Sequence, residues 1–239
     1  MIRGVLFDKD DTLLDLATFW LAPIRRTVNF ALHELGQENN TPLRHALEKA
    51  CGFDGETLIA ESPVVAGTNA DVIGAMMAVL AERGITTEND VLFARLCETY
   101  LEYACLRDGT AQPTGNLHRV LDTLHAQNIF TGVATSDSYA STMHALEKMG
   151  IANKIDAVFT ADRVTHPKPA PDMAEHFCTR FALTANEVAM VGDSAGDMQF
   201  ARNAGLLAIY FDHNTAPANV DCDHRITHIE DVIALLCKN

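Results

Sequence analysis

The sequence predicts an α/β protein: a doubly wound, Rossmann-like parallel sheet with an inserted all-helical cap domain. Short apolar runs typical of buried strands alternate with amphipathic helical segments over most of the chain. Several of these runs end directly in acidic or hydroxyl residues, and the carboxyl ends of parallel strands are where such sheets bind ligands. More than a hundred residues separate Asp10 from Thr135, which is far longer than a loop or a crossover between neighbouring strands.

The first predicted strand is the apolar run Gly4-Val5-Leu6-Phe7, which ends in Asp8-Lys9-Asp10-Asp11-Thr12. A carboxylate at a strand end can attack an electrophile or bind a hard cation, and a neighbouring carboxylate can move protons. Taken alone, the Asp8 and Asp10 pair is equally compatible with a solvated acidic turn. Candidate sites farther along the chain favour a catalytic or metal-binding role for this pair over a solvated turn.

The long stretch after this strand has a helical pattern and carries no strand signal. Helices are expected over residues 19–35, 42–50, 69–83 and 88–107. The sequence therefore predicts a helical domain at residues 16–108. This domain interrupts an α/β core that is made of residues 1–15 and 109–239.

Strands and helices alternate in the remainder of the core. Strands are expected over 129–134, 156–160, 188–192 and 206–211. Helices are expected over 116–127, 141–149, 171–181, 197–204 and 229–237. This alternation predicts a parallel, doubly wound sheet.

Two further candidate sites follow predicted strands. Thr135 and Ser136 end the strand over 129–134, where hydroxyls and free N–H groups can hold phosphate oxygens; helix capping is the ordinary alternative. Lys168 lies between Pro167 and Pro169, which hold it on a stiff loop outside any helix interior. A solvated surface lysine is the alternative to a site role there.

The last candidate site follows the strand over 188–192. Asp193 and Asp197 come after it, and Gly192 and Gly196 allow close backbone approach. Hard oxygen ligands at such a place suit Mg²⁺, which is held by one or two carboxylates. An ordinary helix N-cap explains one of these acidic residues but not both.

The order Asp-x-Asp, Thr, Lys, Gly-Asp-x3-Asp, each after its own strand, resembles the haloacid dehalogenase-like (HAD) superfamily, which consists mostly of phosphatases. The resemblance extends from Phe7 to Asp197 and through Asn203-Ala204-Gly205. It implies that Asp8 is the nucleophile. It also implies that Asp10 is the general acid/base, and that its backbone carbonyl and Asp8 both bind Mg²⁺.

The same resemblance assigns roles to the other motif residues. Thr135 would hold the phosphoryl oxygens with help from the N–H of Ser136. Lys168 would neutralise nucleophile and phosphate. Asp193 would complete the metal site, and Asp197 would orient Lys168 or a metal-bound water.

Asp11 departs from the family pattern, which usually has glycine at that position. Aspartate tolerates left-handed backbone geometry better than most residues, so the sharp turn can form. A carboxylate that faced the site would repel a phosphate dianion. We therefore expect the side chain of Asp11 to point outward.

The resemblance implies a Mg²⁺-dependent phosphatase that hydrolyses a small phosphate monoester, such as phosphoglycolate, through an aspartyl-phosphate intermediate. A helical cap over the cleft favours a small phosphorylated metabolite as the partner. A sugar phosphomutase of the same superfamily and a non-catalytic phosphate-binding protein are the alternatives. Haloacid dehalogenases lack the second aspartate, so Asp10 argues against their chemistry.

Composition agrees with this interpretation. The net charge of −14 argues against nucleic acid or an anionic membrane as a partner. No run reaches the ~18 apolar residues of a membrane span, and the chain enters its first strand at once, so we expect a cytoplasmic protein without a cleavable signal. The six cysteines are scattered, which predicts reduced thiols without a metal-binding or disulfide framework.

Overall fold

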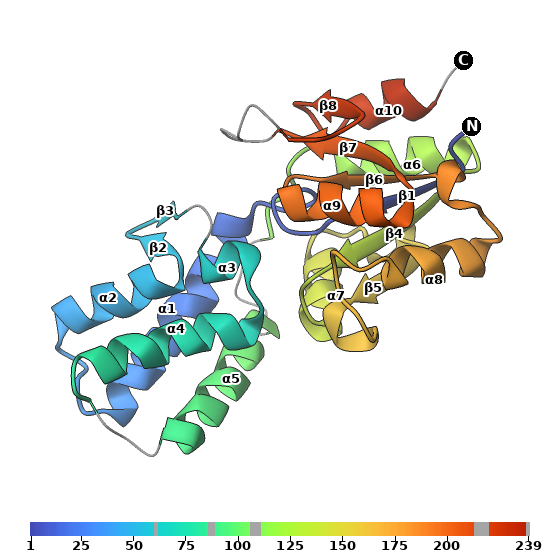
Figure 1. Cartoon of the computed structure of the whole chain (residues 1–239). Helices are drawn as coiled ribbons and strands as arrows, with labels where there is room; N and C mark the ends of the chain where they lie inside the picture. Colours follow the sequence, from blue (N-terminus) through green and yellow to red (C-terminus); the bar gives the residue numbers. More distant parts are fainter. Residues whose placement is uncertain (60–61, 86–88, 106–110, 213–219, 238–239) are drawn as a thin grey trace. The chain divides into compact units, whose positions relative to one another are not determined.

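The computed structural model describes residues 1–59, 62–85, 89–105, 111–212 and 220–237 (Figure 1). The chain divides into two compact units. One unit comprises Met1–Asp15 and Ala111–Asn239, and the other comprises Leu16–Thr110.

The first unit contains a six-stranded sheet in the order β5-β4-β1-β6-β7-β8. Every neighbouring pair in it is parallel. Its strands are β1 (Gly4–Phe7), β4 (Phe130–Thr135), β5 (Ala157–Thr160), β6 (Val188–Gly192), β7 (Leu207–Phe211) and β8 (His224–Ile226). The chain runs from β1 to β4 and β5 on one side, then returns to β6 on the other. This arrangement confirms the predicted doubly wound fold, and β1 lies where the strand order reverses.

In the part of this unit that the structure describes, five α-helices flank the sheet: α6 (Leu117–Ala126), α7 (Tyr139–Lys148), α8 (Asp172–Phe181), α9 (Ala195–Ala204) and α10 (Asp231–Leu236). Helices α8 and α9 cover one face, where their apolar side chains join one cluster with strand residues. Helices α6 and α10 pack together on the other face (Figure 1). In α6 the buried residues recur at three- and four-residue steps, and Asn116 caps the helix by accepting the N–H of Arg119 at 3.1 Å.

Two glycines in adjacent strands make room for one aromatic ring. A Cβ at Gly4 of β1 would lie 2.6 Å from the ring of Phe177, and a Cβ at Gly132 of β4 would lie 2.8 Å from the same ring. Phe177 itself is fully buried on α8. The glycines therefore permit close packing of helix α8 on the two strands that lead to Asp8 and Thr135.

The second unit contains α1 (Leu16–Glu34), α2 (Thr41–Cys51), α3 (Pro63–Ala66), α4 (Asn69–Glu82) and α5 (Asn89–Cys105). Helix α1 packs on α2 and α5, and α4 also packs on both. A small antiparallel hairpin interrupts the helices, with strands β2 (Phe53–Asp54) and β3 (Thr57–Leu58). This hairpin adds strands to a segment whose sequence pattern predicts helices alone, because two-residue strands are too short to show alternation.

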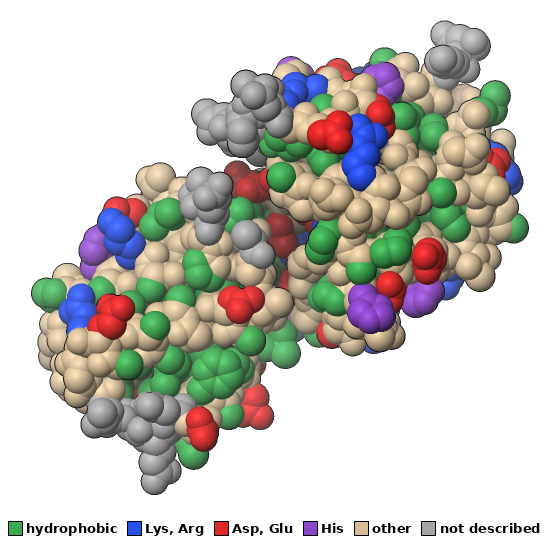
Figure 2. Space-filling model, in the orientation of Figure 1, with side chains coloured by type: hydrophobic (Ala, Val, Ile, Leu, Met, Phe, Trp, Pro, Cys, Tyr) green, Lys and Arg blue, Asp and Glu red, His purple; other side chains and the backbone are tan. Residues whose placement is uncertain are grey.

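Within the described ranges, no helix combines the length and the apolar composition needed to cross a membrane. On the face drawn in Figure 2, the basic side chains of the described residues lie scattered, singly or in small groups. The five cysteines whose side chains are described are free thiols: Cys51, Cys97, Cys178, Cys222 and Cys237.

Candidate active site

The loop after β1 is held by backbone hydrogen bonds at both ends. The N–H of Asp8 donates to the carbonyl of Val191 at 2.8 Å, which extends the β1–β6 pairing by one residue. The carbonyl of Lys9 accepts the N–H groups of Leu13 at 2.9 Å and Leu14 at 3.1 Å. Asp8 therefore has a fixed position against β6, and the residues after it form a closed turn.

Asp11 adopts the left-handed backbone conformation in this turn, with φ of 52°. This is the geometry that the sequence analysis expected aspartate to tolerate in place of glycine. The side chain is half-buried. The pKa of Asp193 is raised by burial, by the charges of Asp197 and Asp8, and to a smaller extent by that of Asp11. The charge of Asp11 is therefore felt at Asp193, and the expected outward direction of its side chain stays a prediction.

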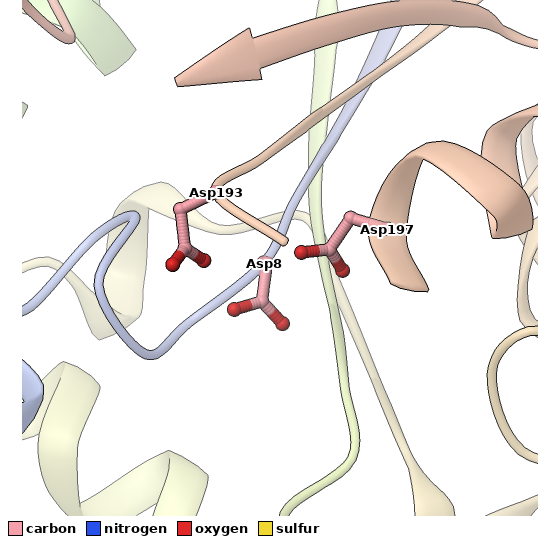
Figure 3. Close-up of side chains that lie close together, drawn as sticks. All are labelled: Asp8, Asp193 and Asp197. Carbon is pink, nitrogen blue, oxygen red and sulfur yellow. The ribbon is translucent and has the colours of Figure 1, made fainter. Parts of the chain in front are cut away.

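Three carboxylates meet at the carboxyl edge of the sheet (Figure 3). Asp8 follows β1, Asp193 follows β6, and Asp197 comes from the first turn of α9. One oxygen from each lies within 4.8 Å of the others. Asp8 and Asp197 are buried, and Asp193 is half-buried. The structure thus brings together three of the four aspartates that the sequence analysis placed in the site.

The electrostatics of this group favour a cation. Burial raises the pKa of Asp8 to about 7; the charge of Lys168 opposes this, and the charges of Asp197 and Asp10 add to it. The pKa of Asp193 is also raised well above its usual value, first by burial. Hard carboxylate oxygens that repel one another at the end of a sheet fit the ligand preference of Mg²⁺. The donor set therefore fits the predicted metal site.

Lys168 lies between two of these carboxylates. Its Nζ donates to Asp8 Oδ1 and to Asp197 Oδ1, both at 2.6 Å, and its side chain is nearly fully buried. Burial alone would lower the pKa of Lys168, but the charges of Asp197 and Asp8 outweigh it and raise the pKa. The lysine therefore stays charged. Its proline-flanked loop is tied to α9, because Asn203 Nδ2 donates to the carbonyl of Pro169 at 2.8 Å.

Asp197 serves a helix and a lysine at the same time. Its Oδ2 accepts from the N–H of Ser194 at 3.2 Å and from Ser194 Oγ at 2.6 Å. The Asp197 N–H in turn donates to Ser194 Oγ at 3.1 Å, which completes the capping box of α9. Its Oδ1 accepts from Lys168. Gly192 makes this approach possible, because a Cβ there would lie 2.4 Å from the Cβ of Asp197.

Thr135 and Ser136 lie at the same edge of the sheet as Asp8. Val133 pairs with Phe7 in the β1–β4 register, so Thr135 ends its strand level with the start of the acidic loop. Thr135 is buried, and its Oγ1 accepts the N–H of Asp137 at 3.1 Å. Ser136 is exposed.

The side chain of Asp10 does not join the acidic group but binds Lys9, a residue that the sequence analysis did not place in the site. Lys9 is completely buried, and its Nζ lies 2.5 Å from Asp10 Oδ1 and 3.2 Å from Asp137 Oδ2. Burial tends to lower the pKa of Lys9, but the charges of Asp10 and Asp137 outweigh it and raise the pKa. The available sequence signal was a lysine enclosed by acidic residues directly after a buried strand.

Comparisons with known proteins agree with this geometry. Residues 5–211 match the family model described as haloacid dehalogenase-like hydrolase. A phosphoglycolate phosphatase of Nitrosospira multiformis is 26% identical, covering 100% of this chain and 97% of that protein. A probable phosphatase, IndB, of Dickeya dadantii is 41% identical over a shorter match, covering 36% of this chain and 37% of IndB.

Solved structures show the same fold. A predicted phosphoglycolate phosphatase from Haemophilus somnus superposes with a TM-score of 0.71 at 18% identity, covering 98% of this chain and 97% of that one. The family match spans strands β4 to β7, nearly all of β1 and the motif residues from Asp8 to Asp197, and it confirms the resemblance predicted from the motifs. The chain belongs to the haloacid dehalogenase-like hydrolase family.

Proposed function

We propose that this protein is a Mg²⁺-dependent phosphatase that hydrolyses a small phosphate monoester through an aspartyl phosphate on Asp8. The observation that carries the proposal is the contact of Lys168 with Asp8 beside Asp193. A carboxylate nucleophile needs charge balance to approach a phosphate dianion, and a buried ammonium with a cation site next to it supplies that balance.

The proposed reaction has two steps. A carboxylate oxygen of Asp8 forms the bond to phosphorus as the bond to the leaving oxygen breaks, and Asp10 gives that oxygen a proton. Asp10 then takes a proton from water, which attacks phosphorus and releases phosphate and free Asp8. Such proton transfers contribute roughly 10²- to 10⁴-fold to a rate.

The other residues hold charge and position. Lys168 balances the charge on the transferring oxygens, while Thr135 and the N–H of Ser136 would hold the phosphoryl group. Mg²⁺ held by Asp8, Asp193 and the carbonyl of Asp10 would supply further charge neutralisation. Asp197 keeps Lys168 in place through its Oδ1.

The substrate proposal is a small phosphorylated metabolite of the phosphoglycolate class, and we place the enzyme in the cytoplasm. The phosphoglycolate phosphatase of N. multiformis supports this choice, because its sequence aligns with the whole of this chain. The net charge of −14 supports a small substrate over nucleic acid. A sugar phosphomutase is the second candidate, because it would use the same core residues and return the phosphoryl group to a sugar instead of water.

A screen of phosphorylated metabolites with Mg²⁺ tests the proposal. Free phosphate and phosphorylated products are both measured, and Asp8→Asn is the control for the nucleophile. Phosphate release that disappears in Asp8→Asn supports a phosphatase. Transfer to a second sugar position without phosphate release would show a mutase. Phosphate binding by both proteins without turnover would show a non-catalytic binding protein.

A further inference from the structure

Lys9, which directly follows the nucleophile Asp8, has surroundings similar to those of Lys168. Each lysine is buried and lies between two carboxylates from different segments of the sheet edge. Lys168 joins Asp8 to Asp197, whereas Lys9 joins Asp10 to Asp137. The proposed reaction gives Lys168 a role and leaves Lys9 without one.

Packing does not explain a lysine at this position. Lys9 has no exposed side-chain surface. Moving an ammonium out of water is energetically unfavourable, and an apolar side chain of similar volume often stabilises a protein interior equally well or better. A charge that is kept in such a place, in contact with a carboxylate of the site, points to a use for that charge.

The far end of the contact is anchored in the loop that follows β4. Asp137 is buried, and its Oδ1 accepts the N–H of Ser138 at 2.6 Å. The N–H of Asp137 donates to Thr135 Oγ1 at 3.1 Å. The Lys9 ammonium therefore connects Asp10 to the segment that contains Thr135, which we proposed to hold the phosphoryl group.

We propose that Lys9 is a positioning residue that holds the carboxylate of Asp10 in the place from which it protonates the leaving group, with Asp137 as its anchor. The inference rests on the proposed phosphatase function. Asp10 has two bonds of rotation between backbone and carboxylate. A charge-assisted contact of 2.5 Å to Oδ1 restricts both rotations, and the ion pair with Asp137 ties the Lys9 ammonium to the loop after β4.

This role predicts a dependence on the leaving group. An alkyl phosphate expels a strongly basic alkoxide, so its cleavage needs a well-placed proton donor. p-Nitrophenyl phosphate expels a weakly basic phenolate that needs little protonation. The ratio kcat/KM reports steps up to the first irreversible one, so it is insensitive to the later hydrolysis of the aspartyl phosphate. Misplacement of Asp10 should therefore lower kcat/KM for alkyl phosphates more than for the aryl ester.

The test compares Lys9→Met and Asp137→Asn with the wild type on one alkyl phosphate from the metabolite screen and on p-nitrophenyl phosphate. Lys154→Met is the matched control, because Lys154 forms an ion pair with Asp122 at a part-exposed position of the same unit. We expect Lys9→Met to lower kcat/KM at least tenfold more for the alkyl ester than for the aryl ester. Asp137→Asn should act in the same direction but less strongly, and the control should change neither value.

Equal losses on the two esters, or no loss, would overturn the role of Lys9. If Lys9→Met does not fold, Asp137→Asn decides alone, because it removes the anchor charge and leaves both Lys9 and Asp10 in place. Failure of the proposed function would look different, since the wild type itself would then release no phosphate from either ester.

Discussion

Lys168 Nζ lies 2.6 Å from Asp197 Oδ1, which joins the loop before α8 to the first turn of α9. The same Nζ also donates to Asp8, so the contact with Asp197 holds the ammonium beside the nucleophile. Two charges that are held on a rigid frame need no reorganisation when charge develops on a transferring phosphoryl group. The position of the Lys168 ammonium thus depends on the first turn of α9.

Replacing Asp197 should therefore impair turnover more than stability. Asp197→Asn keeps an oxygen for the cap of α9 but removes the charge that orients Lys168, and we expect kcat to fall by about 10- to 100-fold. Ser194→Ala is the matched variant, since it removes a capping partner and keeps the carboxylate. That variant should lose about 1 kcal/mol of stability with a smaller change in kcat. Steady-state kinetics and urea unfolding would measure both, and full activity of Asp197→Asn would contradict the assigned role.

Asp8→Asn should abolish turnover while stabilising the metal-free protein at high pH. The pKa of Asp8 is about 7 in the folded protein and near 3.8 in the unfolded chain, so folding favours the protonated carboxyl. The associated stability is complete below the unfolded pKa and is lost as pH rises through 7. Asparagine does not titrate. The free energy of unfolding of the variant should therefore rise relative to that of the wild type as the pH increases from about 4 to about 7, by an amount on the order of a few kcal/mol, and the difference should then stay constant at higher pH.

Guanidinium unfolding in EDTA across this pH range provides the measurement. Asp122→Asn is a suitable control, because that carboxylate is exposed and its pKa is lowered by its contact with Lys154. A constant difference in the free energy of unfolding between Asp8→Asn and wild type at all pH values would count against a raised pKa of Asp8.

Activity should require Mg²⁺, and Ca²⁺ should inhibit. Mg²⁺ demands near-octahedral geometry at short distances, whereas Ca²⁺ accepts more ligands at longer ones and often binds carboxylates through two oxygens. If Ca²⁺ binds both carboxylate oxygens of Asp8, this carboxylate loses the geometry that it needs to attack phosphorus. Phosphate release would be measured in EDTA, with Mg²⁺ restored, and with Ca²⁺ added in competition. Equal rates with the two ions, or full activity in EDTA, would argue against a metal site at Asp8 and Asp193.

Removing the charge of Asp11 should lower KM. Its carboxylate adds to the negative potential felt at Asp193, and that potential also opposes a phosphate dianion. Asp11→Asn removes the charge and keeps a residue that tolerates φ of 52°, whereas Asp11→Gly also adds chain entropy to the unfolded state. We expect KM to fall about two- to fivefold in both variants, with a lower melting temperature only in Asp11→Gly. An unchanged KM in Asp11→Asn would show that the charge is fully screened.

The strands that position the site were predictable because each joins a continuous apolar run to polar residues. The runs ending at Asp8, Thr135 and Asp193 gave β1, β4 and β6 nearly to the residue. Parallel strands bring their carboxyl ends together, so pattern and topology together predict that their polar residues gather. The order of the motifs, through the family resemblance, added an expected role for each of these residues.

Short elements and side-chain directions were not predictable in the same way. Strand β8 has three residues, two of them exposed, so its pattern is too brief to read. Likewise, the sequence encloses Lys9 between acidic residues but does not show that its side chain points into the interior and binds Asp10 and Asp137. Such contacts depend on how β1 and the loop after β4 pack, which residue types alone do not specify.

The ring of Phe177 fills space left by the missing side chains of Gly4 and Gly132. In evolutionary terms, the residues tolerated at each of these three positions depend on the residues at the other two. A methyl group on either strand would collide with the ring, and a smaller side chain on α8 would leave a cavity beneath both strands. Neutral drift at one position is therefore blocked until another has changed. A library that randomises all three together should recover pairings, such as alanine in a strand with a smaller residue on the helix, that no single-site scan of this protein would reveal.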